Sequence, residues 1–287
     1  MKISVSSYSF YQYVRAGKLT LVELPKLAHD IGFDAIEFID IPGETQEEKL
    51  ELAAQIKAEA DALGMEINAY TIGACLYQET DEASDKEVAR LVDQLDVAVA
   101  LGAKVMRHDV VYALGKTGAA RSFDGMLPTI AKNAQRVADE AAKRGITTCT
   151  ENHGYISQDS DRVERLFNAV NRDNFGILVD IGNFVCVDED NVTAVSRLAP
   201  YAVHVHAKDF FIQEFGTRPE GWGTTRGRRY YCGCVLGEGV VPVRQCIDIV
   251  RAAGYDGYFS LEYEGKIDCI EGIKRGIENL ISFGVEA

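Results

Sequence analysis

The sequence has 287 residues, of which 47% are apolar and 26% are charged, as is ordinary for a globular protein. Its formal net charge of −14 argues against general binding to nucleic acid or to anionic membranes, because phosphate groups would be repelled. The seven cysteines include no C-x-x-C pair and indicate buried thiols in a reducing cytoplasm, and no stretch is apolar enough for a signal peptide or a membrane span.

Short, β-branched apolar runs alternate with helical patterns along the chain, which is typical of repeated βαβ units. Strands are expected near residues 3–8, 35–39, 66–72, 104–108, 146–150, 175–179, 202–205 and 257–261. Helices are expected near residues 19–31, 45–63, 84–101, 124–144, 159–170, 192–198, 242–253 and 269–283. Eight strands in strict alternation with helices predict an α/β fold, a single-domain (β/α)8 barrel over residues 1–287, because doubly wound sheets usually have five or six strands. One long irregular loop, about residues 209–239, is expected between the seventh strand and the seventh helix.

Polar side chains follow four consecutive strands at the points where the apolar runs end. The active site of such a barrel lies at the carboxyl ends of the strands, so these groups should converge at one mouth. Three carboxylates and one imidazole form a mostly oxygen site that suits one divalent metal ion, with Mn²⁺ favoured on ligand hardness and Mg²⁺, Co²⁺ or Zn²⁺ as alternatives. His204 shares the strand parity of His206, so periodicity alone does not choose between the two histidines. The candidate ligands are Glu151, Asp180, His206 and Glu262.

The second half of the chain contains five motifs in order: Glu151-Asn152-His153-Gly154, Val179-Asp180-Ile181-Gly182-Asn183, His204-Val205-His206-Ala207-Lys208-Asp209, Leu236-Gly237-Glu238-Gly239 and Ser260-Leu261-Glu262. With these motifs the chain resembles the sugar isomerase and epimerase barrels related to xylose isomerase and to the zinc-dependent apurinic/apyrimidinic endonucleases. The resemblance covers essentially the whole chain, implies the four ligands above and favours His206 over His204. It also implies that Glu151 and Glu262 act as acid and base. Cys232-Gly233-Cys234 and Asn183 depart from the family pattern and argue against a trinuclear zinc site and against a close match to ketose 3-epimerases.

Several neighbouring residues have both a functional and a structural interpretation. His153 is expected to be a general base or to orient a ligand, and Lys208 to neutralise an enolate oxygen or to pair with Asp209. His108 either lines the pocket or packs in the core, and Asn183 is expected beside the substrate. The long loop contains Trp222 and Arg226, which form either a lid over the substrate or a solvated loop or subunit contact.

Three functions fit these features. The first is a metal-dependent isomerase or epimerase of a ketose or related sugar-like small molecule, in which Glu151 and Glu262 move a proton next to a carbonyl through an enediolate. The second is a lyase of the inosose dehydratase type, or a C-glycoside deglycosidase subunit acting on 3-oxo sugars, with His153 as the base. The third is sugar binding without chemistry, which the complete set of four ligands argues against. Association into a homo-oligomer is left open by the sequence.

Overall fold

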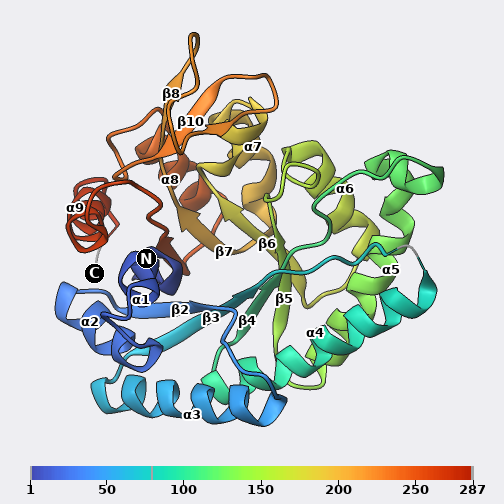
Figure 1. The fold of residues 1–287 in the computed structure, drawn as a ribbon, viewed down its shortest axis with the longest axis horizontal. Coiled ribbons are helices and arrows are strands. Elements are labelled where there is room, and N and C mark those ends of the chain that lie inside the picture. The colour runs from blue at the N-terminus through green and yellow to red at the C-terminus, as the bar shows by residue number, and fades with distance from the viewer. Residues whose placement is uncertain (1, 79, 286–287) are drawn as a thin grey trace.

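The computed structural model describes residues 2–78 and 80–285, and its centre is a closed barrel of eight parallel strands. The barrel order is β1-β11-β7-β6-β5-β4-β3-β2, so sequence neighbours are also neighbours around the barrel (Figure 1). This confirms the predicted fold class. The barrel strands are β1 (Lys2–Ser6), β2 (Ala35–Ile39), β3 (Glu66–Ile72), β4 (Val105–His108), β5 (Thr147–Glu151), β6 (Phe175–Asp180), β7 (Ala202–Ala207) and β11 (Tyr258–Leu261).

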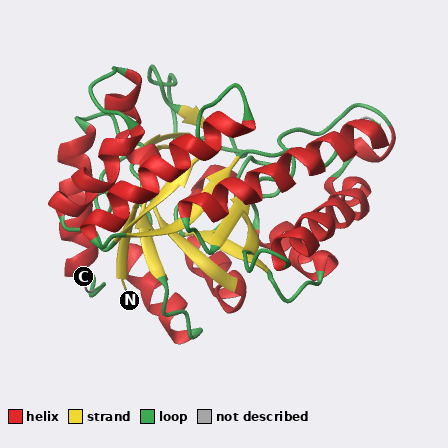
Figure 2. Cartoon of the chain, turned by 90° about the horizontal axis from the view of Figure 1, so that it is seen from below, coloured by secondary structure: helices red, strands yellow, loops and turns green. Residues whose placement is uncertain are grey.

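Helices surround the strands of the barrel (Figure 2). Apolar side chains of the helices and the strands form one buried core. Their ends follow local sequence signals: Thr45 and Glu48 form a capping box at the start of α3, and Gly64 ends it in the left-handed conformation with φ of 68°. The outer helices are α2 (Leu24–Ile31), α3 (Gln46–Leu63), α4 (Asp81–Leu101), α5 (Phe123–Ala142), α6 (Ser160–Val170), α7 (Asn191–Leu198), α8 (Val243–Ala252) and α9 (Cys269–Ser282). No helix in the described part of the chain is both long and apolar enough to cross a membrane.

Two regions differ from the sequence-based expectation. The helix expected from residue 19 begins as α2 only at Leu24, next to Pro25, after a 3₁₀ turn, and a short helix α1 (Tyr11–Arg15) precedes it. The segment expected to be irregular contains a three-stranded antiparallel sheet of β8 (Phe210–Gln213), β10 (Tyr230–Gly233) and β9 (Gly223–Thr224). This small sheet stands above the carboxyl end of β7 (Figure 1).

Asp209 anchors both ends of this insertion. Its buried carboxylate accepts hydrogen bonds from the backbone N–H groups of Phe210, Gly237, Gly239 and Val241 at 2.8 to 3.0 Å. Four charge-assisted bonds from both ends of the insertion fix where it leaves and rejoins the barrel. The glycine-rich stretch around Glu238 is therefore a loop-shaping element, because its amides face this carboxylate.

Candidate metal centre and active site

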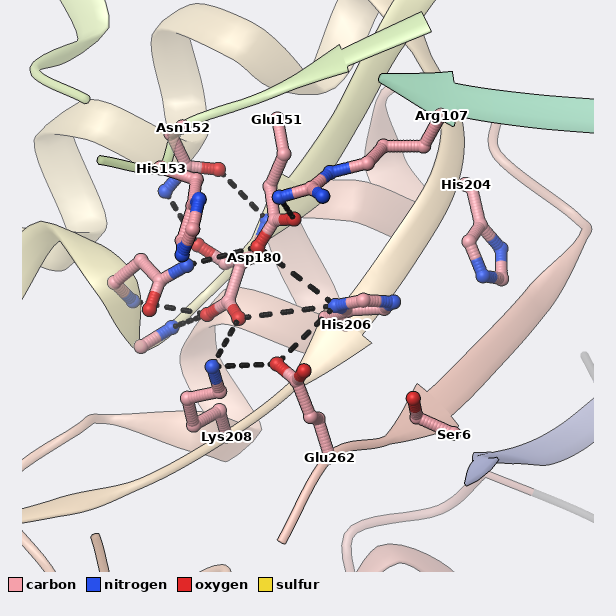
Figure 3. A network of polar contacts seen from close by, with 12 residues as sticks. Ser6, Arg107, Glu151, Asn152, His153, Asp180, His204, His206, Lys208 and Glu262 are labelled. Atoms are coloured by element: carbon pink, nitrogen blue, oxygen red, sulfur yellow. Dashed lines mark hydrogen bonds and ion pairs between the residues drawn. The ribbon is translucent and has the colours of Figure 1, made fainter. Parts of the chain in front are cut away.

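The four candidate ligands converge at the carboxyl end of the barrel (Figure 3). Glu151 and Asp180 end strands β5 and β6, His206 lies near the end of β7, and Glu262 directly follows β11. These four strands are consecutive around the barrel. One side-chain ligand atom from each residue lies within 4.8 Å of the others, so the structure brings together the whole predicted set.

The two carboxylate oxygens of Asp180 have different surroundings. Its Oδ1 accepts hydrogen bonds from the backbone N–H groups of Gly182 at 2.7 Å and Asn183 at 2.9 Å, which caps the following turn. Its Oδ2 is buried and has no hydrogen-bond partner in the described residues. One oxygen therefore shapes the backbone, while the other is available to a ligand.

Glu37, in the middle of β2, orients His206 from inside the barrel. Its Oε2 accepts hydrogen bonds from Nε2 of His204 at 2.6 Å and from Nε2 of His206 at 3.0 Å, and its Oε1 lies 2.8 Å from Nε2 of His206. A carboxylate only accepts hydrogen bonds, so both Nε2 atoms donate. Neutral His206 then carries its proton on Nε2 and presents the Nδ1 lone pair to the cluster, as a metal-bound histidine with a carboxylate behind it does. His204 contacts Glu37 and is not part of the four-residue cluster.

The donor set fits a divalent cation. Besides Asp180 Oδ2, Nδ1 of His206 is buried without a hydrogen-bond partner in residues 2–78 and 80–285, and both atoms face the same cluster. Burial, together with the charges of Glu151 and Glu262, raises the pKa of Asp180 to about 6. A hard or borderline metal ion would bind these unpartnered ligand atoms and would neutralise the crowded carboxylates.

Two cationic side chains hold the glutamates. Nη2 of Arg107, on β4, lies 2.6 Å from Oε2 of Glu151, and the amide of Asn183 donates to Oε1 of Glu151 at 2.8 Å. Nζ of Lys208 lies 2.5 Å from Oε2 of Glu262. Lys208 therefore pairs with Glu262 and not with Asp209. Although burial opposes ionisation, the positive charge of Lys208 lowers the pKa of Glu262 well below its usual value.

His153 forms a dyad with Asp109 at the edge of the cluster. Its Nδ1 lies 2.9 Å from Oδ1 of Asp109, and the same oxygen lies 2.9 Å from Nη2 of Arg107. Burial disfavours the imidazolium, but the Asp109 carboxylate outweighs it and raises the pKa of His153. Because Asp109 contacts Nδ1, the Nε2 atom of His153 is available to another group, and His153 lines the central cavity.

The other predicted substrate contacts are placed differently. Asn183 contacts the ligand Glu151, whereas His108 is fully buried, 6.3 Å from the ring of Phe175, and does not line the cavity. Alternate strand residues point to opposite faces, so Arg107 rather than His108 reaches the site. Arg226 pairs with Asp159 at 3.0 Å.

Trp222 lies beside Lys266, whose Nζ is 6.0 Å from its ring centroid. Neither this tryptophan nor Arg226 lines the central cavity. Through Trp222 and Arg226 the insertion contacts neighbouring loops of the barrel, and neither residue reaches the metal cluster.

The central cavity has a volume of about 350 Å³. Its wall includes three of the four cluster residues and, beside them, Arg107, His153, Lys208, Glu264 and Tyr8. Cavities of ~300 Å³ and more accommodate small organic ligands. The sequence-based prediction missed Arg107, Asp109 and Glu37, although Arg107 and Glu37 are charged residues inside short apolar runs and Asp109 directly follows one.

Comparisons with known proteins agree with this fold. A family model described as a xylose isomerase-like TIM barrel matches residues 25–283. A curated relative, an inosose dehydratase from Geobacillus thermodenitrificans strain NG80-2, is 28% identical over 131 residues. That match covers 45% of this chain and 44% of the relative, so the chain matches less than half of the relative's length.

Two solved structures share the fold across nearly the full length. A 3-keto-D-glucoside 4-epimerase from E. coli has a TM-score of 0.71 at 15% identity, with 98% of this chain and 99% of that chain covered. A xylose isomerase-like TIM barrel protein from Mycobacterium smegmatis, solved in complex with magnesium, has a TM-score of 0.71 at 16% identity, with 99% and 96% covered. Sugar-modifying enzymes are thus found among the proteins that this chain is similar to.

Proposed function

Because this chain belongs to the xylose isomerase-like TIM barrel family, we propose that it is a divalent-metal-dependent isomerase or epimerase of a ketose or related sugar-like substrate. The observation that carries the proposal is the pair of glutamates, Glu151 and Glu262, which flank one metal-ligand cluster from strands separated by two others. Two carboxylates on either side of a substrate carbon are what proton removal and return require.

Glu151, Asp180, His206 and Glu262 would hold the metal, for which we favour Mn²⁺ over Mg²⁺, Co²⁺ and Zn²⁺ because three of the four donors are carboxylates. When bound, the cation would supply positive charge near the substrate oxygens, where negative charge develops as the proton leaves. The seven cysteines, all free thiols in the structure, agree with a reducing compartment, and we propose the cytoplasm as the location.

The protein side chains divide the remaining work. Arg107 and Asn183 fix both oxygens of Glu151, so this carboxylate keeps one orientation toward the cavity. Glu262, on the opposite flank of the cluster, receives or returns the proton. Lys208, held between Glu262 and Glu264, places a buried ammonium beside the position where a substrate oxygen would become anionic.

The proposal is tested by proton exchange. Protein loaded with Mn²⁺ is incubated in D₂O with a panel of ketoses and 3-oxo sugars, and the substrates are analysed by mass spectrometry and proton NMR. We expect one solvent deuterium at the carbon next to the carbonyl, and loss of this exchange in Glu151→Gln and Glu262→Gln. A preparation that converts a substrate without any exchange would refute the mechanism.

A second candidate, a lyase, is favoured by the His153–Asp109 dyad and by the inosose dehydratase relative. In a lyase, His153 removes the proton next to the carbonyl and a β-leaving group departs. His153→Asn should then abolish turnover while the metal content stays unchanged, and an unsaturated product should appear in wild-type reactions. Full turnover in His153→Asn would exclude this role. Sugar binding without chemistry would require protein that gains no activity on any of these substrates when Mn²⁺ is added.

A further inference from the structure

A second cavity opens directly beside the central one. It has a volume of about 510 Å³, larger than the central cavity, and lies between the segment that follows β1 and the loop that follows β11. Tyr8 and Glu264 line both cavities. A ligand bound at the metal cluster can therefore extend past these two residues into the second cavity, which we call the outer cavity.

Three flat groups form one wall of the outer cavity. The rings of Tyr8 and Tyr11 are stacked with centroids 5.8 Å apart and planes inclined by 22°. The guanidinium of Arg15, one helical turn after Tyr11, lies 4.1 Å from the centroid of the Tyr11 ring. This Arg15–Tyr11–Tyr8 ladder runs from the exposed surface to the edge of the central cavity, and ladders of this kind bind the faces and edges of rings.

The ladder is held in place by contacts that leave its rings uninvolved. The side-chain amide of Gln12 donates to the carbonyl oxygens of Gly265 at 3.3 Å and Ile267 at 3.0 Å. Ser9 accepts a hydrogen bond from the backbone N–H of Tyr263 at 2.8 Å. The short helix α1 is thereby tied to the loop after β11, so the outer cavity is built into the resting structure.

The charges of the outer cavity favour a neutral occupant. Among its lining residues, Arg15 and Glu264 carry the charges, and they have opposite signs. A phosphate beside Arg15 would also be near the carboxylate of Glu264, which would repel it. Tyrosine hydroxyls and flat faces instead suit a ring with an apolar face and polar edges.

We propose that the substrate carries a second, neutral ring joined to the reacting sugar, and that this ring lies in the outer cavity against Tyr8 and Tyr11. The inference rests on the proposed function, because it places the reacting sugar at the metal cluster. The second ring is either another sugar or an aromatic aglycone, since both offer a face that stacks on tyrosine. The protein would thus act on glycosides in preference to free monosaccharides.

Equilibrium binding tests this without requiring turnover. The probes are the 3-oxo derivatives of methyl β-D-glucoside, 4-nitrophenyl β-D-glucoside and cellobiose, and their affinities for Mn²⁺-loaded protein are obtained from ligand-dependent thermal stabilisation. We expect at least one ring-bearing probe to bind about tenfold more tightly than the methyl glycoside, as stacking on aromatic side chains supplies. Whether the aryl or the disaccharide probe binds best identifies the kind of ring.

Two variants on the same helix provide the comparison. Tyr11→Ala should remove most of the advantage of the ring-bearing probes. Tyr13→Ala is the matched control, because Tyr13 does not line the cavity and its hydroxyl donates to Asp268. Equal affinity for all three probes, no binding of any, or equal losses in the two variants would overturn the inference.

The two proposals fail in different ways. A binding preference for the ring-bearing probes without deuterium exchange into any substrate would support the ring site in the outer cavity and refute the proposed proton-transfer reaction. Exchange into free ketoses without a preference for a second ring would retain the chemistry and overturn the inference.

Discussion

Replacing Glu37 with glutamine should weaken metal binding although Glu37 is not a ligand. The Oε2 atom of Glu37 accepts from both imidazole N–H groups, at 2.6 Å for His204 and 3.0 Å for His206, and Oε1 also lies 2.8 Å from Nε2 of His206. Glutamine has an NH₂ group in place of one of these oxygens, so in either orientation of the amide an N–H donor would face the N–H of His206. His206 would then avoid the clash by moving its proton to Nδ1, the atom that faces the metal cluster.

The expected loss follows from this switch of tautomer. Substitution of a residue that orients a metal-bound histidine weakens metal binding by about 10- to 100-fold. That corresponds to about 1.4 to 2.7 kcal/mol of binding free energy. The dissociation constant for Mn²⁺ is measured by competition with a fluorescent chelator at fixed pH, on protein whose circular dichroism matches wild type.

Glu189→Gln is the matched control for Glu37→Gln. Glu189 is partly buried and lies outside the metal cluster, and its carboxylate accepts from the backbone N–H of Ser160 at 2.8 Å. The control should retain wild-type affinity because it removes the same charge without touching His206. Unchanged Mn²⁺ affinity in folded Glu37→Gln would refute the reasoning, since His206 would then need no carboxylate behind it.

Three further predictions concern stability. Chelation of the metal should lower the free energy of unfolding by about 4 kcal/mol relative to protein at a metal concentration 1,000 times the Kd, as measured by urea titration, and no change would mean that the metal does not bind the native state. Asp209→Asn should cost about 3 kcal/mol in the same titration, because four backbone N–H groups would face an amide that has one acceptor; a loss below 1 kcal/mol would show that the insertion is held elsewhere. Despite burial, Arg107 and His153 lower the pKa of Asp109 from 3.8 to about 2. At pH values above the pKa of Asp109 in the unfolded chain, its ionised carboxylate stabilises the fold, and this stability is lost as the pH falls toward the lower pKa of the folded protein. Asp109→Asn should therefore flatten the acid limb of the curve of stability against pH. An unchanged acid limb would contradict this pairing.

The fold was predictable because its signals are local. Each barrel strand lies within about two residues of the expected run, and helices such as α3 end at the glycines that mark them. The sheet within the insertion was not predictable, because β8, β9 and β10 are short and pair with one another across stretches of loop. Pairing of this kind leaves little periodicity in the sequence.

The same distinction applies to the site: residues at strand ends were predictable, and residues that act through distant partners were not. Glu151, Asp180, His206 and Glu262 follow strand ends, and the barrel topology alone brings such positions to one mouth. Glu37 was missed because its partners lie 167 and 169 residues away, so no local pattern links them.

Strand β4 ends in two adjacent polar residues, Arg107 and His108. The choice between them depends on which alternate face of β4 points inward, and the register of the barrel decides this. The sequence left open whether His108 lines the pocket or packs in the core, and it gave no role to Arg107; the structure buries His108 and turns Arg107 to the cavity.

The central claim is that four side chains bind one cation, and anomalous diffraction tests it most directly. Crystals grown with Mn²⁺ should show, in data collected near the manganese edge, a single strong peak bonded to Glu151, Asp180, His206 and Glu262. A map without a peak there, or with the ion between Glu37 and His204 instead, would contradict the account.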